Sequence, residues 1–194
     1  MMKIEKIKEL IEKNGGVITT NMLDKNNIHR QYLKSLIDQG ILVKVARGIY
    51  AIPEKYVSEY YILGEEYKNA IFSHNTALYF YDLTDRTPFE IDMTFSSNVR
   101  PNNYMLSPHY INKERLELGA TTKELSDGTV VRVYDMERTI CDIIRDRNKI
   151  DSQILNMALK SYMERNDKNL SLLYEYAKKF NILKILKMYM EVLA

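Results

Sequence analysis

Six polar or basic side chains lie close together in the sequence and have the chemistry needed to contact a nucleic acid. They are Arg30, Gln31, Lys34, Ser35, Lys44 and Arg47. Glutamine can make two hydrogen bonds to adenine and arginine two to guanine, whereas lysine and arginine neutralise phosphates. We therefore expect the first four to contact base edges of double-stranded DNA, and the last two to contact phosphates or the minor groove.

The distribution of charge agrees with this expectation. Between residues 25 and 50, five basic residues stand against one acidic residue, Asp38, whereas the whole chain carries a formal net charge of only +2. Phosphate neutralisation supplies most of the non-specific affinity of proteins for DNA. A solvated basic face is the alternative explanation. DNA binding is favoured because the charge coincides with a helix-turn-helix pattern.

A helix must position the first four side chains. Leu33, Leu36 and Ile37 have the i, i+3, i+4 spacing of one helical stripe, which predicts a helix over residues 28–40. Gly40 tolerates a positive φ and is suited to end that helix. Asn27 is expected to cap its N-terminus and to leave backbone N–H groups free for a phosphate. His29 is expected either to pack or cap there or to contact DNA.

A short β-hairpin must position the last two side chains. Residues 41–45 are strand-like, Arg47-Gly48 can turn the chain, and residues 49–52 can return as a second strand ended by Pro53. Residues 17–19 are expected to add a third strand. With helices over residues 3–14 and 21–25, the region is predicted to be a winged helix-turn-helix.

This region resembles the N-terminal domain of AbiEi-type antitoxins. The resemblance rests on Arg30, Leu33 and Leu36, on the run Gly40-Ile41-Leu42, and on the run Arg47-Gly48-Ile49-Tyr50. A looser resemblance lies in residues 134–142, where the family has an Arg-Thr-aliphatic-x-Asp helix after its last strand. Here Arg138, Thr139 and Asp142 occupy those positions.

The resemblance implies a type IV toxin–antitoxin system of abortive infection, a form of phage defence. It implies that the N-terminal domain represses its own operon by binding inverted repeats in the promoter. It also implies that the C-terminal domain counters a nucleotidyltransferase-like toxin, with no direct contact expected. The alternative is a plain winged-helix transcriptional regulator whose second domain senses a ligand or dimerises.

The remainder of the chain predicts a second domain, so the fold class is α+β. We expect the winged helix-turn-helix at residues 1–55, a connecting helix or linker at 56–70 and a mixed α/β domain with a small sheet at 71–194. Its expected strands are 90–95, 109–112, 116–118, 121–125 and 130–134. Its expected helices include a short one capped by Ser73, one over 136–147 capped by Asp135, and three at the C-terminus over 153–165, 170–180 and 182–193.

Other reactive residues are given structural roles. His74 beside Ser73 is expected to cap or hydrogen-bond, Cys141 to be a small core residue, and Arg138 with Asp142 to be a surface ion pair. Asp92 could begin a nuclease motif, but no Asp/Glu-x-Lys follows on a strand. We therefore expect no enzyme activity, no metal site and no cofactor.

Composition predicts a cytoplasmic protein that does not enter the membrane. No apolar run approaches the ~20 residues of a membrane-spanning helix, and the N-terminal residues lack the apolar segment of a signal peptide. The single cysteine cannot form an internal disulfide, which suits a reducing compartment.

Overall fold

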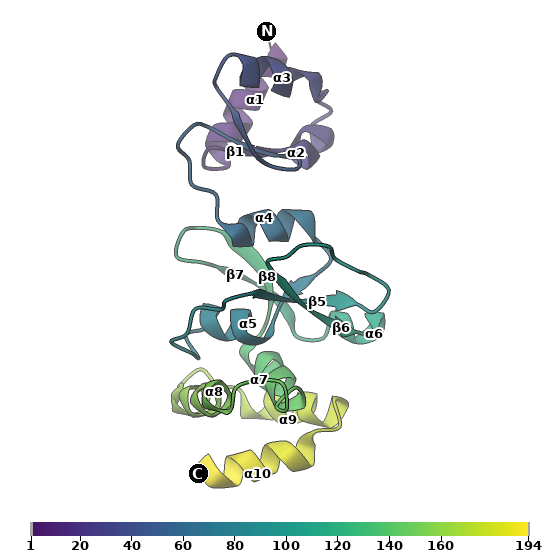
Figure 1. Ribbon diagram of the computed structural model, residues 1–194, viewed down its shortest axis with the longest axis vertical. Coiled ribbons are helices and arrows are strands. Elements are labelled where there is room, and N and C mark those ends of the chain that lie inside the picture. The colour runs from purple at the N-terminus through teal and green to yellow at the C-terminus, as the bar shows by residue number, and fades with distance from the viewer. Residues whose placement is uncertain (1, 194) are drawn as a thin grey trace. The chain divides into compact units, whose positions relative to one another are not determined.

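The computed structural model describes residues 2–193, with the side chains of residues 3–191. The chain divides into two compact units, Met1–Tyr67 and Lys68–Ala194, which we describe separately. In agreement with the predicted class, helices and two small sheets make up the fold (Figure 1). Among the described residues, no helix combines the length and apolar character needed to cross a bilayer.

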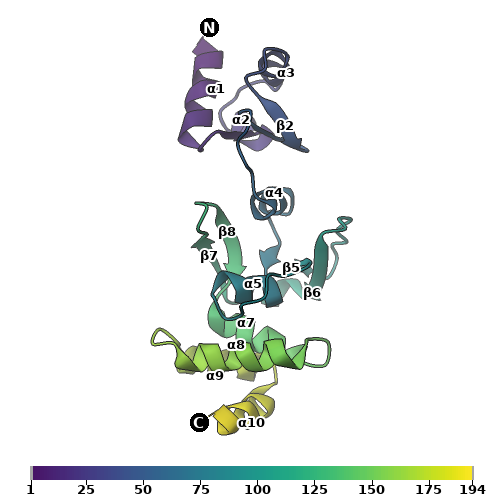
Figure 2. The ribbon, with the colours of Figure 1, turned by 60° about the vertical axis from the view of Figure 1, so that its left-hand side comes forward.

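The first unit is a helical domain with a three-stranded antiparallel sheet, ordered β1-β3-β2. Its first three helices and strand β2 can be followed in Figure 2. Val17 on β1 and Val43 on β2 both pair with Ala51 on the central strand. Its elements are α1 (Met2–Lys13), β1 (Val17–Thr19), α2 (Thr20–Lys25), α3 (Gln31–Asp38), β2 (Val43–Ala46), β3 (Ile49–Ala51) and α4 (Glu59–Glu66).

The core of the first unit forms from the apolar stripes of its helices. Leu33 and Leu36 of α3 are buried together with Ile7 of α1 and Leu23 of α2. Ile37 belongs to the predicted stripe but is 36% exposed, so the stripe is narrower than its spacing indicated. Helix α4 lies in the segment expected to connect the domains, and its Tyr61 and Ile62 pack against buried residues of this unit's sheet.

Helix α3 begins three residues later than the sequence predicted. Asn27 is not its N-cap, because it lies at φ 54° and closes α2 instead. The N–H of Asn27 donates to the carbonyl of Asp24, and the N–H of Ile28 donates to that of Leu23. This is the hydrogen-bond pattern of a left-handed residue that ends a helix. Gly40, at φ 70°, ends α3 in the same way, as predicted.

The second unit is built on a five-stranded mixed sheet, ordered β6-β5-β4-β8-β7. Strands β5 and β6 are parallel, as are β4 and β8, and the other neighbours are antiparallel. Its elements are β4 (Ile71–Phe72), α5 (His74–Phe80), β5 (Ile91–Ser96), β6 (Leu106–Ile111), α6 (Lys113–Leu116), β7 (Ala120–Glu124), β8 (Val130–Tyr134), α7 (Met136–Arg145), α8 (Ser152–Glu164), α9 (Leu170–Lys179) and α10 (Leu183–Leu193).

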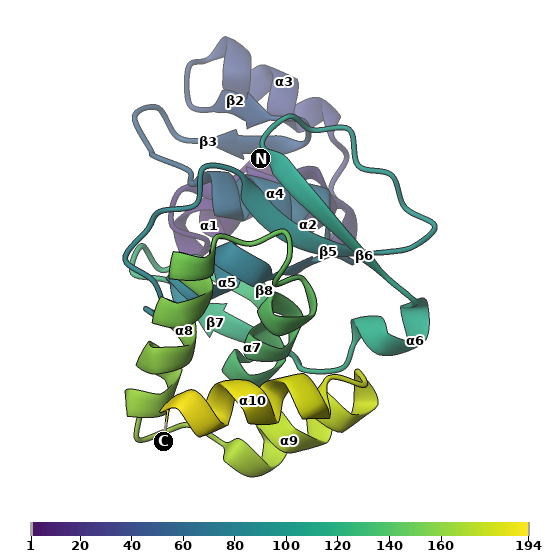
Figure 3. The ribbon, with the colours of Figure 1, turned by 60° about the horizontal axis from the view of Figure 1, so that its bottom comes forward.

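Helix α5 packs against the sheet at β5 and against α7, and α8, α9 and α10 form a further layer around α7 (Figure 3). The main core lies between these layers and contains Ile140 and Ile143 of α7, Leu159 of α8 and Leu173 of α9, all fully buried. Helix α7 therefore lies between α5 and the C-terminal helices, and Cys141 is buried among its core residues as expected.

Three expectations for the second unit are wrong. Residues 116–118 do not form a strand, because the chain turns into α6 after Asn112. The alternation of polar and apolar residues over 90–95 is typical of a half-buried strand, but in β5 the polar residues are buried too. The Asp92 carboxylate lies 2.6 Å from Nε2 of His109, and the Thr94 hydroxyl donates to that of Ser73. The pair of Arg138 with Asp142 is not on the surface, because both side chains are at most 2% exposed.

Candidate nucleic-acid interface

Helix α3 presents Gln31, Lys34 and Ser35 from one side of its first turns. Gln31 and Lys34 are exposed, and Ser35 is half-buried. The Ser35 hydroxyl already accepts a hydrogen bond of 2.8 Å from the Nε2 of Gln39. Because the opposite side of α3 is fixed in the core by Leu33 and Leu36, these polar groups must face outward.

The hairpin of β2 and β3, which we call the wing, presents Lys44 and Arg47. A hydrogen bond joins its turn to α2. Lys44 is exposed on β2 opposite Tyr50, and Arg47 is exposed at the turn between the two strands. Gly48 occupies the turn at φ 75°, and its carbonyl accepts a 2.9 Å hydrogen bond from the N–H of Thr20. A Cβ at Gly48 would lie 2.8 Å from the Thr20 hydroxyl, so only glycine permits this approach.

Arg30 is bound by a carboxylate that the sequence pattern did not include. Its Nε and one terminal nitrogen donate to the two oxygens of Asp24, at 3.2 and 2.5 Å. These hydrogen bonds hold the pKa of the Asp24 carboxyl below its ordinary value and raise the pKa of Arg30. Asp24 lies one residue outside the basic stretch, so counting charges within that stretch could not reveal the pair.

Backbone N–H groups at the start of α3, which were expected to be free for a phosphate, already have acceptors within the protein. The N–H of Gln31 donates to the Nδ1 of His29 at 3.2 Å, so His29 has the capping role. The N–H of Leu33 donates to the carbonyl of Arg30 at 3.0 Å. An exposed phosphate site at this helix N-terminus, expected from an Asn27 cap, is therefore not formed.

Among the described residues, three of the four predicted cationic contact residues have no carboxylate partner. Lys34, Lys44 and Arg47 are exposed, and the described part of the chain contains no ion pair that involves them. They come from two elements that pack into one unit, α3 and the β2–β3 hairpin. Unpaired cations on such elements are suited to contact phosphates across a groove and its flank.

The second unit brings together polar groups that no local motif indicated. His74, Asp92, His109 and Asp146 are dispersed along the sequence but meet where α5, β5, β6 and the end of α7 adjoin. Burial alone would lower the pKa of His109, but hydrogen bonds to Asp146 and Asp92 outweigh it and raise this pKa to about 9. Only strand pairing and helix packing could have revealed this cluster.

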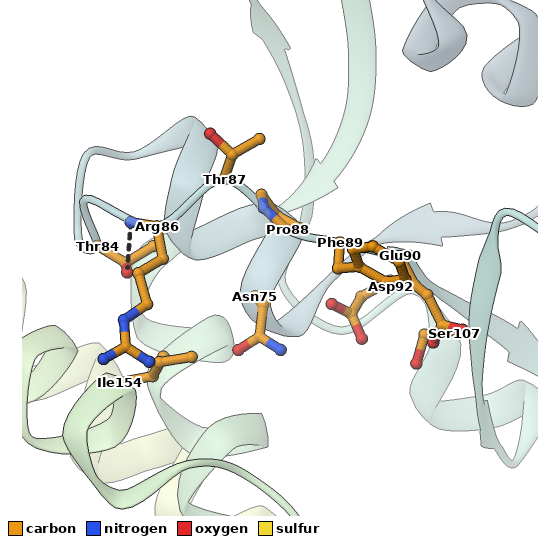
Figure 4. Close-up of a pocket in the computed structure, with 10 residues that line it drawn as sticks. All are labelled: Asn75, Thr84, Arg86, Thr87, Pro88, Phe89, Glu90, Asp92, Ser107 and Ile154. Carbon is orange, nitrogen blue, oxygen red and sulfur yellow. Dashed lines mark hydrogen bonds between the residues drawn. The ribbon is translucent and has the colours of Figure 1, made fainter.

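A cavity of about 340 Å³ adjoins the same strands on another side (Figure 4). Asn75 and Asp92 contribute polar atoms to it, and Arg86 and Ile154 line it from the loop after α5 and from α8. The side-chain oxygen of Asn75 is buried and has no hydrogen-bond partner.

Comparison with known proteins gives one family match. Residues 5–53 match the family described as "Transcriptional regulator, AbiEi antitoxin". This match confirms the resemblance to AbiEi antitoxins over the segment that contains α1 to β3. No curated protein matches the chain.

A solved structure shares the fold of most of the chain. The crystal structure of the RV2827C protein from Mycobacterium tuberculosis aligns with a TM-score of 0.52 at 16% sequence identity. The alignment covers 90% of this chain and 72% of that protein. At this identity the likeness is one of fold.

Proposed function

We propose that this chain, whose residues 5–53 match the AbiEi antitoxin family, is a DNA-binding antitoxin that represses its own operon. Its first unit binds inverted repeats in the promoter. Its second unit counters a nucleotidyltransferase-like toxin in the cytoplasm without direct contact, as in type IV systems of abortive infection. The chain has no enzymatic role in this proposal.

The observation that carries the DNA-binding part is the set of exposed, unpaired cations Lys34, Lys44 and Arg47. Helix α3 would enter the major groove, where Gln31 is available to an adenine edge. The hairpin would follow the flanking backbone through Lys44 and Arg47. Arg30 can contact DNA only after DNA displaces Asp24 from its guanidinium.

The antitoxin part is tested by co-expression with the neighbouring gene. We expect the full chain to restore the growth of cells that express a nucleotidyltransferase-like protein encoded beside it. A chain cut after Tyr67 keeps the buried core of the first unit and should retain weak DNA binding but lose protection. Protection by the truncated chain would overturn the assignment of neutralisation to the second unit.

A plain transcriptional regulator is the second candidate, and the cavity of about 340 Å³ is the observation that favours it. The unpartnered oxygen of Asn75 is a polar group that a small ligand with a hydrogen-bond donor could satisfy. In this case co-expression would not rescue growth, whereas the promoter complex would still form and a ligand would change its affinity.

A further inference from the structure

Two histidines and an aspartate of the second unit each direct one possible ligand atom toward a common point. His74 is the first residue of α5, His109 lies on β6, and Asp146 follows the last residue of α7. The Nε2 of His74 is 3.3 Å from Oδ2 of Asp146, and the Nδ1 of His109 is 3.6 Å from the same oxygen. One ligand atom from each of the three residues lies within 4.8 Å of the others.

These separations fit a metal ion. With metal–nitrogen and metal–oxygen bonds of about 2.0–2.2 Å, the ligand atoms of a tetrahedral site lie roughly 3.4 Å apart. The two measured distances, 3.3 and 3.6 Å, bracket that value. The three atoms are close enough together to approach one ion, but one of the two rings must turn first, because nearly parallel, stacked rings cannot both hold the ion in their planes.

The remaining ring nitrogens are held as they are in metal sites. The Nε2 of His109 is 2.6 Å from Oδ1 of Asp92, and the Nδ1 of His74 is 3.0 Å from the hydroxyl oxygen of Ser73. Histidine ligands generally donate their second N–H to a carboxylate or other acceptor, which fixes the tautomer and the ring orientation. In the tautomers that donate in this way, Nε2 of His74 and Nδ1 of His109 are the lone-pair donors.

The backbone and ring packing also hold the cluster in place. His74 adopts φ 46°, a left-handed conformation that is costly for a residue with a side chain. Its ring is stacked on that of His109 at a centroid distance of 3.5 Å, with 10° between the planes. The positive φ of His74 and the ring stacking both accompany the close approach of the two imidazoles beside Asp146.

The cluster contains more than one carboxylate. Asp92 and Asp146 bring two negative charges to a site where their side chains are 6% and 27% exposed. The neighbouring Arg145 is already paired with Asp142 at 2.7 Å. Buried carboxylates are stabilised by paired charges or by metal ions.

We propose that His74, His109 and Asp146 bind a divalent first-row transition metal ion, with Zn²⁺ the ion best matched to the donors. Two imidazoles and one carboxylate suit Zn²⁺ better than Mg²⁺ or Ca²⁺, which prefer oxygen ligands. A cavity of about 280 Å³ is lined by the same three residues. A fourth coordination position can therefore be filled by water or by a small ligand from this cavity.

The test uses the full chain, freed of metal by a chelator and of any affinity tag. Calorimetric titration with ZnCl₂ should give one ion per chain, and CoCl₂ should give the visible absorption of tetrahedral Co²⁺. Asp146→Asn and His109→Ala should each weaken binding by more than ~100-fold. Asp92→Asn should weaken it by ~10–100-fold, because it loosens the orientation of His109 only.

The chain provides a matched control, because its third histidine, His29, lies in the first unit. His29→Ala should bind Zn²⁺ as the unaltered chain does. Equal binding by Asp146→Asn and the unaltered chain, or a titration without one tight site per chain, would overturn the proposal. Circular dichroism shows whether each variant is folded. If a variant is unfolded, the unaltered and His29→Ala chains test the proposal. Both should bind one Co²⁺ ion with a tetrahedral spectrum, and the absence of that spectrum would contradict the site. Promoter binding through the first unit is a separate measurement and does not depend on this outcome.

Discussion

Asp24 binds the guanidinium of Arg30 through two hydrogen bonds, so one of the four residues expected to contact bases is neutralised in the free protein. Both side chains are about half exposed, which lets a phosphate or guanine compete with the carboxylate for Arg30. The pair thus reduces the positive charge next to α3 and sets a cost for recruiting Arg30 to DNA.

Replacing Asp24 by asparagine should strengthen DNA binding. The change removes a negative charge near the phosphates and frees Arg30, so the slope of log K against log salt should steepen by about one unit. Fluorescence anisotropy with labelled promoter DNA at several salt concentrations measures both effects. Asp167→Asn is the matched control, because Asp167 forms a similar exposed pair with Arg165 in the second unit. An unchanged salt slope for Asp24→Asn would mean that Arg30 does not approach the DNA.

Replacing Arg47 by alanine should weaken binding to promoter and random duplex by similar factors. Arg47 is exposed at the turn of the wing, where a phosphate contact carries no sequence information. The salt slope should become shallower by about one unit. Arg100→Ala removes an exposed arginine of the second unit and should change neither quantity. A loss confined to the promoter sequence would instead place Arg47 on bases.

Replacing Gln31 by alanine should lower the preference of the protein for its promoter sequence over random duplex. Gln31 is exposed at the start of α3, and a bidentate contact with adenine discriminates by roughly 1–3 kcal/mol. We expect this loss on the preferred site and almost none on random duplex, as measured by competition binding. The control is Gln153→Ala, an exposed glutamine on α8. An equal loss on both duplexes would contradict the assignment of Gln31 to base reading.

Replacing Asp142 by asparagine should strongly destabilise the second unit. Arg138 is fully buried, donates to Asp142 at 2.9 Å and to the carbonyls of Arg115 and Leu118, and stacks on Tyr134. Removing one partner of a buried ion pair costs about 3–5 kcal/mol because the other charge is left unpaired. Asp167→Asn, which breaks an exposed pair, should cost about 1 kcal/mol or less. Urea unfolding compares the two, and equal midpoints would contradict the buried role.

Local pattern was sufficient to predict much of the fold. The stripe of Leu33 and Leu36, the turn at Gly48 and the strand 130–134 all depend on residues close in sequence, and the structure contains each of them. Asp135 likewise caps α7 as predicted, accepting from the N–H of Arg138 at 2.7 Å. Periodicity and capping chemistry report on neighbours within one or two turns, so these features can be recognised in one sequence.

The features that were predicted wrongly or missed depend on tertiary contacts, or on residues that can take either of two local roles. Arg138 and Asp142 have the spacing of an ordinary surface pair, and only the helices packed around α7 bury them. Asn27 can begin one helix or end another, and the short turn after α2 selects the second role. The cluster of His74 with His109 joins residues from separate elements, so no spacing in the sequence could indicate it.

The most direct test of DNA binding is an anisotropy titration with the promoter upstream of the chain's own operon. It compares the unaltered chain with a variant in which Lys34, Lys44 and Arg47 are all alanine, and with a second variant in which Lys178, Lys184 and Lys187 of the C-terminal helices are alanine. We expect the first variant to lose most of its affinity and about three units of salt slope, and the second to bind as the unaltered chain does. Undiminished promoter binding by the first variant would contradict the proposal that α3 and the wing form the DNA-binding surface.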